Sequence, residues 1–68
     1  MRSFYTDHLG FTADLCKLID GVYTRLTVRS PSGNAFIREI YPTWDDALDV
    51  LRSISDSWTN DLTHQSLT

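Results

Sequence analysis

The second half of the chain carries apolar residues at steps of three and four, the spacing of one face of an α-helix. The series runs through Trp44, Ala47, Leu48, Leu51, Ile54 and Trp58. Thr43 stands in an N-cap position before it, and Asp45 and Asp46 fall in the first turn, where the helix dipole favours negative charge. The pattern predicts a helix over residues 43–58 that packs its apolar face on the core.

Residues 22–41 instead alternate with a period of two, as a strand with one buried face does. The turn-forming sequence SPSGN at residues 30–34 divides this stretch, so we expect an antiparallel hairpin. With an even loop, Ile37 lies opposite or diagonal to Leu26, and Arg38 points outward. The inner face then comprises Val22, Thr24, Leu26, Val28, Ala35, Ile37, Glu39 and Tyr41.

Residues 11–19 fit both periods, so their structure is ambiguous. The helical reading uses the spacing of Phe11, Leu15, Leu18 and Ile19, but Asp20-Gly21 follows and is a strong hairpin signal. A turn there would set Ile19, Leu15 and Ala13 opposite Val22, Leu26 and Val28. The strand is favoured because these pairs are apolar and join faces already assigned to the core.

The predicted fold is α+β: a three-stranded antiparallel β-meander over residues 11–41 with the C-terminal helix packed on one face. The alternative is an N-terminal helix, a β-hairpin and a C-terminal helix. Residues 1–10 are expected to be irregular or a short helical turn, with Phe4 and Tyr5 closing an edge of the core. Residues 61–68 lack periodicity and are expected to be mobile.

Composition and charge narrow the class of protein. A chain of 68 residues with 41% hydrophobic residues can form one domain with a core. Its net charge of -3 disfavours nucleic-acid binding through overall charge. The single cysteine, Cys16, cannot form an internal disulfide, which favours a reducing cytoplasmic location. No signal peptide or membrane-spanning segment is indicated.

The sheet face away from the helix is the first candidate binding surface. It would carry Tyr23, Arg25, Thr27, Arg29, Phe36, Arg38 and Ile40. Arginines interleaved with aromatic residues are typical of surfaces that hold phosphates and stack bases. Asp14 and Asp20 would lie on the same face and could neutralise nearby arginines, so a solvated face and a protein-binding face also fit the pattern.

The outer face of the helix is the second candidate surface. It carries four carboxylates interrupted by Arg52, namely Asp45, Asp46, Asp49 and Asp56. Like charges four residues apart cost an isolated helix a few tenths of a kcal/mol, so this row does not serve helix stability. Carboxylates on a rigid rod can stand in for nucleic-acid phosphates in a basic groove. A solvated face is the alternative interpretation.

The sequence offers little for catalysis, and we expect no enzyme, no metal and no cofactor. His8 and His64 lie near opposite ends of the chain, and Cys16 has no histidine at a motif-like distance. The three glycines are far apart and do not form a phosphate-binding loop.

The run RLTVRSPSGNAFIREIYPTWDDALDVL, residues 25–51, is similar in outline to HicB-type antitoxins and to the arm-binding domains of phage integrases. In both, a hairpin leads into a helix that is capped by Thr and has an Ala on its inner face. The resemblance implies an antitoxin-like regulator or a DNA-binding domain. It is one of patterning only, because an arm-binding domain would be basic and the helix here is acidic.

These observations predict a non-enzymatic, acidic protein-binding module. It would act as an inhibitor or regulator of a larger complex that handles nucleic acid. Anti-defence or anti-CRISPR proteins of phages or mobile elements are examples of this type. It would be a monomer or homodimer that binds through Tyr23, Arg25, Arg29 and Arg38, through the acidic helix face, or through both. The alternatives are a nucleic-acid-binding domain that uses the arginine and aromatic face, and a small structural or dimerisation subunit.

Overall fold

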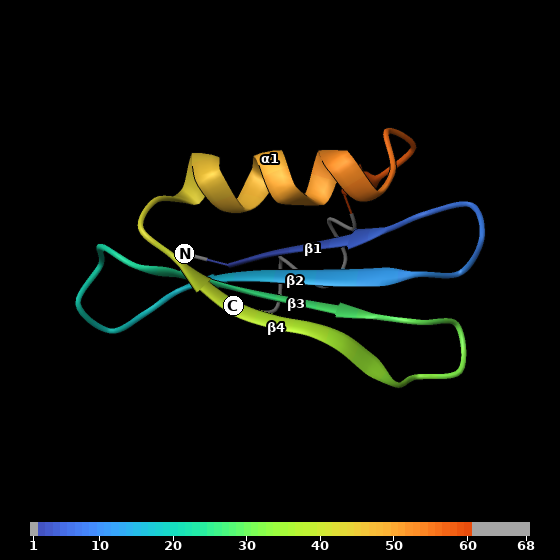
Figure 1. The fold of residues 1–68 in the computed structure, drawn as a ribbon, viewed down its shortest axis with the longest axis horizontal. Coiled ribbons are helices and arrows are strands. Elements are labelled where there is room, and N and C mark those ends of the chain that lie inside the picture. Colours follow the sequence, from blue (N-terminus) through green and yellow to red (C-terminus); the bar gives the residue numbers. More distant parts are fainter. Residues whose placement is uncertain (1, 61–68) are drawn as a thin grey trace.

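The computed structural model describes residues 2–60 and shows a five-stranded antiparallel sheet with one helix across one of its faces (Figure 1). The elements are β1 (Arg2–Thr6), β2 (Thr12–Lys17), β3 (Thr24–Arg29), β4 (Ala35–Tyr41), α1 (Trp44–Ile54) and β5 (Thr59–Asn60). The strand order is β4-β3-β2-β1-β5, so the first four strands form a meander and β5 joins the far side of β1. The α+β class and the helix after the meander are confirmed.

The strand interpretation of residues 11–19 is confirmed, and the alternative with an N-terminal helix is wrong. Leu15 pairs with Leu26 and Ala13 with Val28, and all four side chains are buried. The predicted pairing of Ile19 and Val22 in the core is wrong, because both are exposed. These two residues instead lie in the loop between β2 and β3. In this loop the Asp20 carboxylate accepts a hydrogen bond from the Val22 backbone N–H at 2.9 Å.

The side chains of the hairpin between β3 and β4 lie on the predicted faces of the sheet. Ile37 lies opposite Val28 on the inner face, and Arg38 lies opposite Thr27 on the outer face. A register shift between Val28 and Arg29 absorbs an extra residue next to the loop. The loop closes through a backbone hydrogen bond of 2.9 Å from Gly33 N–H to the Ser30 carbonyl, with Gly33 at φ 94°.

The predicted number of three strands is wrong, because it lacks β5 and because β1 lies within residues 1–10, for which an irregular structure or a helical turn is predicted. All five residues of β1 pair with β2, from Arg2 opposite Cys16 to Thr6 opposite Thr12. Ser3 and Tyr5 consequently face the helix side, whereas Phe4 lies opposite Asp14 on the outer side. A five-residue strand with only two apolar residues gives a weak period-two signal, so it is recognisable chiefly through its partner.

The helix begins as predicted and ends four residues early. The Thr43 hydroxyl accepts a hydrogen bond of 3.1 Å from the Asp46 N–H, which is the predicted N-cap. Ser55 is extended, with φ -158° and ψ 149°. Trp58 therefore does not continue the apolar stripe but folds back, and its indole N–H donates to the Leu51 carbonyl at 2.8 Å. Ser53 and Ser55 favour this early end, because the Ser53 hydroxyl donates to the Val50 carbonyl and the Ser55 hydroxyl accepts a hydrogen bond from the Ser57 N–H.

The core lies between α1 and the inner face of β2 and β3. It consists of Ala13, Leu15, Leu26, Val28, Ala47 and Leu51, with Trp44 and Trp58 packed partly buried against it. Within residues 2–60, α1 covers one face of the sheet, and no described element covers the opposite face (Figure 1). No helix in residues 2–60 is both long and apolar enough to cross a membrane. The expectations for residues 61–68 and for His64 lie outside the described residues.

We predict that Leu26→Ala lowers the free energy of unfolding by about 2–5 kcal/mol, because Leu26 is completely buried at the centre of the core and its removal leaves a cavity. Leu9→Ala is the matched control: Leu9 is 62% exposed, and its truncation should change stability by less than about 0.5 kcal/mol. Urea denaturation of both variants measures the difference. Equal destabilisation would contradict this core assignment.

We also predict that Thr24→Val stabilises the protein by about 1 kcal/mol. The Thr24 hydroxyl is fully buried and has no hydrogen-bond partner within residues 2–60, so its desolvation is uncompensated. Thr27→Val, on the outer face of the same strand, should lie within about 0.5 kcal/mol of the parent. The midpoint of urea unfolding distinguishes them, and a loss of stability in Thr24→Val would show that the hydroxyl does form a bond.

Candidate functional site

The uncovered face of the sheet forms a shallow hollow of about 340 Å³. Four strands contribute to it, because their outward positions lie side by side in the observed register. The lining residues are Arg2, Phe4, Thr12, Ala13, Asp14, Arg25, Thr27, Arg29 and Arg38. We call the four arginines and the hollow between them the basic sheet face. Four of the chain's six lysines and arginines therefore lie at one site.

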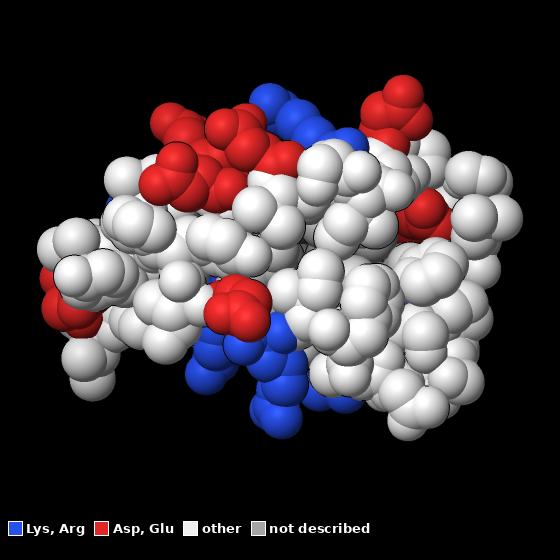
Figure 2. All heavy atoms as spheres, in the orientation of Figure 1, with Lys and Arg blue, Asp and Glu red and all other residues white. Residues whose placement is uncertain are grey.

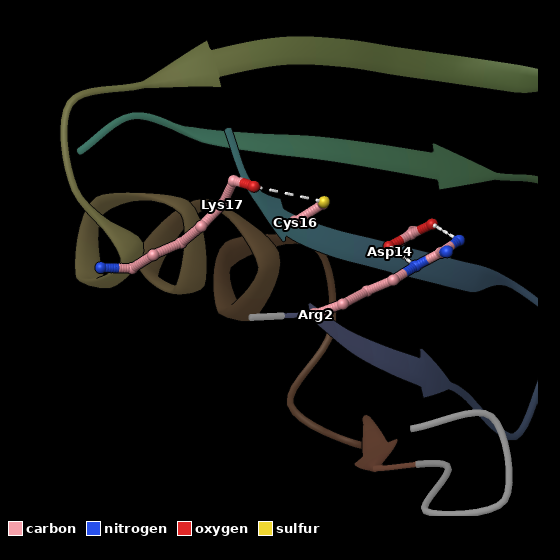
Figure 3. A network of polar contacts seen from close by, with 4 residues as sticks. All are labelled: Arg2, Asp14, Cys16 and Lys17. Atoms are coloured by element: carbon pink, nitrogen blue, oxygen red, sulfur yellow. Dashed lines mark hydrogen bonds and ion pairs between the residues drawn. The ribbon is translucent and has the colours of Figure 1, made fainter. Parts of the chain in front are cut away.

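Arg2 is held in place by Asp14 on the neighbouring strand. Its Nε donates to Asp14 Oδ1 at 3.2 Å and its Nη2 to Oδ2 at 2.6 Å, which is a bidentate salt bridge (Figure 3). The hydrogen bond and the charge of Asp14 raise the pKa of Arg2 above its ordinary value. In Figure 3 the Lys17 side chain extends away from this pair. The sequence analysis expected Asp14 to neutralise arginines of the hairpin. Asp14 instead neutralises Arg2, which lies on the unpredicted strand β1.

The other three arginines are held less firmly. Arg29 Nη1 donates to the Gly33 carbonyl at 3.1 Å, which ties Arg29 to its own hairpin. Within residues 2–60, neither Arg25 nor Arg38 has a salt bridge or a side-chain hydrogen bond, and both are exposed. No described residue occupies the donors of their guanidinium groups, which can bind a ligand.

Charge is segregated between the two sides of the molecule. Acidic side chains gather over α1, and basic side chains gather on the far side of the sheet (Figure 2). The predicted acidic residues Asp45, Asp46, Asp49 and Asp56 are all exposed, on α1 or just after it. Among the described residues none of these four carboxylates is in a salt bridge.

The structure assembles most, but not all, of the predicted outer face. Arg25, Arg29 and Arg38 come together as predicted, but Tyr23 lies in the turn before β3 and does not line the hollow. Phe36 lies at its margin on the edge strand and packs edge-on against Phe11, with 5.9 Å between ring centres. Arg2 and Phe4 were missed because β1 was missed. The signal that could have found them is the alternation of Ser3 and Tyr5 with Arg2 and Phe4.

A second polar cluster joins the turn after β1 to the segment after α1. His8 Nδ1 and the Ser57 Oγ are 2.8 Å apart, and the Ser57 hydroxyl donates to Asp7 Oδ2 at 3.5 Å. The Asp7 carboxylate contacts the serine and not the histidine, so the three groups do not have the order of a serine, base and orienting carboxylate. The cluster instead fixes the C-terminal segment against the turn.

Other chemistry in the described residues is sparse. No group of three or more His, Cys, Asp or Glu side chains within residues 2–60 could hold a metal ion. Cys16 is half-buried, and its Sγ lies 3.5 Å from the Lys17 carbonyl (Figure 3).

No protein-family model matches the chain, and neither a curated protein nor a solved structure is significantly similar to it. The outline shared with antitoxins and integrase arm-binding domains therefore gains no support. The geometry of the site alone carries the functional argument.

We predict that Asp7→Asn destabilises the protein at neutral pH and that this difference disappears in acid. Burial acts to raise the pKa of Asp7, but the hydrogen bond from the Leu9 N–H, the serine hydroxyls that follow α1, the charge of His8 and the Phe11 backbone together lower it. A carboxyl with a lowered folded-state pKa stabilises the fold above its ordinary pKa, and this stabilisation is lost as the pH falls through the folded-state value, which lies below 3.8.

Urea unfolding at pH 7 and near pH 2 measures the effect. Asp49→Asn, which removes an exposed carboxylate from the outer face of α1, is the matched control and should differ little from the parent at either pH. A destabilisation by Asp7→Asn that persists undiminished in acid would show that shape, and not charge, is what Asp7 contributes.

Proposed function

We propose that the protein is a non-enzymatic binding module that docks through the basic sheet face onto a larger complex that handles nucleic acid, and there acts as an inhibitor or regulator. The observation that carries the proposal is the convergence of four arginines from three strands on one hollow, on the sheet face that no element of residues 2–60 covers. The partner's surface must be negatively charged to match it.

Two of the four arginines, Arg25 and Arg38, do not serve the stability of the fold. Like charges on neighbouring strands repel, and Arg25 and Arg38 have no partner in residues 2–60 to offset that repulsion. Both side chains are exposed, so neither covers the core. A face that costs stability and has unused donors is typical of a binding surface.

A binding role, and not a catalytic one, suits the groups that line the hollow. Guanidinium groups hold and orient anions but stay protonated at any physiological pH, so they are poor bases. The carboxylate of Asp14 is already engaged by Arg2. The remaining polar groups are the threonine hydroxyls of Thr12 and Thr27, which can donate further hydrogen bonds to an anion.

The acidic helix face is a second candidate surface. It is favoured by one observation: its four carboxylates, Asp45, Asp46, Asp49 and Asp56, are exposed and form no salt bridge with any described residue. It would contact a basic groove of the same complex. It ranks second because exposed carboxylates on a helix are also well hydrated without a partner.

We predict that the double variant Arg25→Ala/Arg38→Ala loses the captured partner when the tagged protein is used to pull down complexes from a lysate of its native host. The triple variant Asp45→Ser/Asp49→Ser/Asp56→Ser should retain it. Arg52→Ala is the matched control, because it removes an exposed arginine from the helix side. Bound proteins are identified by mass spectrometry, and circular dichroism verifies that each variant is folded.

Capture that depends on the helix carboxylates and not on Arg25 and Arg38 would replace the basic sheet face with the second candidate surface. Capture that none of the variants changes would exclude both surfaces.

A further inference from the structure

We infer that the occupant of the basic sheet face is the phosphodiester backbone of a single-stranded nucleic acid. The inference rests on the proposed function and names the part of the complex that this face contacts.

The arginines form a row with a regular spacing. Arg25 and Arg29 are four residues apart on β3, a separation of about 14 Å along a strand. Arg38 lies opposite Thr27, midway between them on the adjacent strand. Diagonal neighbours across two strands are about 7–8 Å apart. The order Arg25, Arg38, Arg29 therefore presents guanidinium groups at intervals comparable with the separation of successive phosphates along an extended strand.

Arg2 extends this row with a guanidinium group whose orientation is already fixed. Asp14 engages its Nε and Nη2, which leaves Nη1 available, since no described residue accepts a hydrogen bond from that atom. The hydroxyls of Thr12 and Thr27 lie between the arginines. Guanidinium groups bind phosphate oxygens through paired hydrogen bonds, and hydroxyls add single ones.

The net charge of -3 does not oppose this binding, because the acidic groups of the helix lie on the other side of the molecule. The helix side and the open side of the sheet are separated along the vertical direction of Figure 2, in which the molecule extends 25 Å. Interactions between exposed charges are largely screened beyond about 8 Å at physiological ionic strength. Among the described residues that line the hollow, four guanidinium groups stand against one carboxylate, and this local surplus of positive charge attracts an approaching polyanion.

The sheet is too wide to enter the major groove of duplex DNA. Four paired strands span about 14 Å between the outer backbones, whereas the major groove of duplex DNA is about 12 Å wide and admits a two-stranded ribbon. A single strand can lie along the hollow, with its bases reaching Phe36, which is 51% exposed beside Arg38 on the edge strand. A single strand is therefore the form of nucleic acid that this face fits.

The direct test is a titration of fluorescein-labelled oligothymidylate and oligouridylate with the full chain, followed by fluorescence anisotropy. With three or four phosphates neutralised, the logarithm of affinity should fall with the logarithm of salt concentration with a slope of about -2 to -3. This corresponds to a loss of roughly thirtyfold in affinity between 50 and 200 mM salt. Arg25→Ala/Arg38→Ala should weaken binding by about tenfold or more at low salt and halve the slope.

Three controls make the result specific. Arg52→Ala, which changes the net charge by one unit as each sheet substitution does, should leave the affinity within about twofold of the parent. A duplex of the same length should bind more weakly, and polyglutamate of matched charge should not compete. The inference is overturned by an absence of oligonucleotide binding at low salt, by tighter binding of duplex, or by full competition from polyglutamate.

The same variants separate this inference from the proposed function. Loss of the captured partner after nuclease treatment, together with oligonucleotide binding that needs Arg25 and Arg38, supports both. A partner that survives nuclease and still requires Arg25 and Arg38 supports docking through the basic sheet face, but on a protein surface, and overturns the single-stranded occupant.

Discussion

The antiparallel pairing of β2 with β3 is the constraint on which the rest of the structure depends. It places Leu15 opposite Leu26 and Ala13 opposite Val28, and α1 packs on these four residues. A slip of one residue would turn every side chain of β3 to the opposite face. The same register that buries Leu26 and Val28 therefore points Arg25 and Arg29 outward, so the core and the basic sheet face are two results of one pairing.

The sequence predicts those parts of the fold that have a strong local period or a recognisable stop signal. The N-cap at Thr43, the strands on either side of Asp20-Gly21 and the outward direction of Arg38 are of this kind. It does not predict β1, because five residues alone cannot bury a face and this strand is defined by its pairing with β2. The end of α1 is missed because Trp58 matches the helical period, yet reaches the core from beyond the helix.

The candidate site was predicted in part for the same reason. The three arginines of the hairpin follow from its alternation, but Arg2 enters through the missed strand and takes Asp14 as its partner. Net charge was the less informative observation. Summed over the chain it describes an acidic protein, whereas the fold sorts most of the charged side chains to two opposite sides (Figure 2). The isoelectric point of the whole chain does not report where on the surface the charges lie.

The separation of charge across the sheet also gives the molecule an electric dipole moment that runs from the helix side to the open side of the sheet. In the field of a highly charged polyanion such a dipole experiences a torque as well as an attraction, so the molecule turns during its approach. It would arrive with the sheet foremost and the helix pointing away into solvent. In such a field the fold would orient the protein before any contact is made, with α1 on the side away from the polyanion.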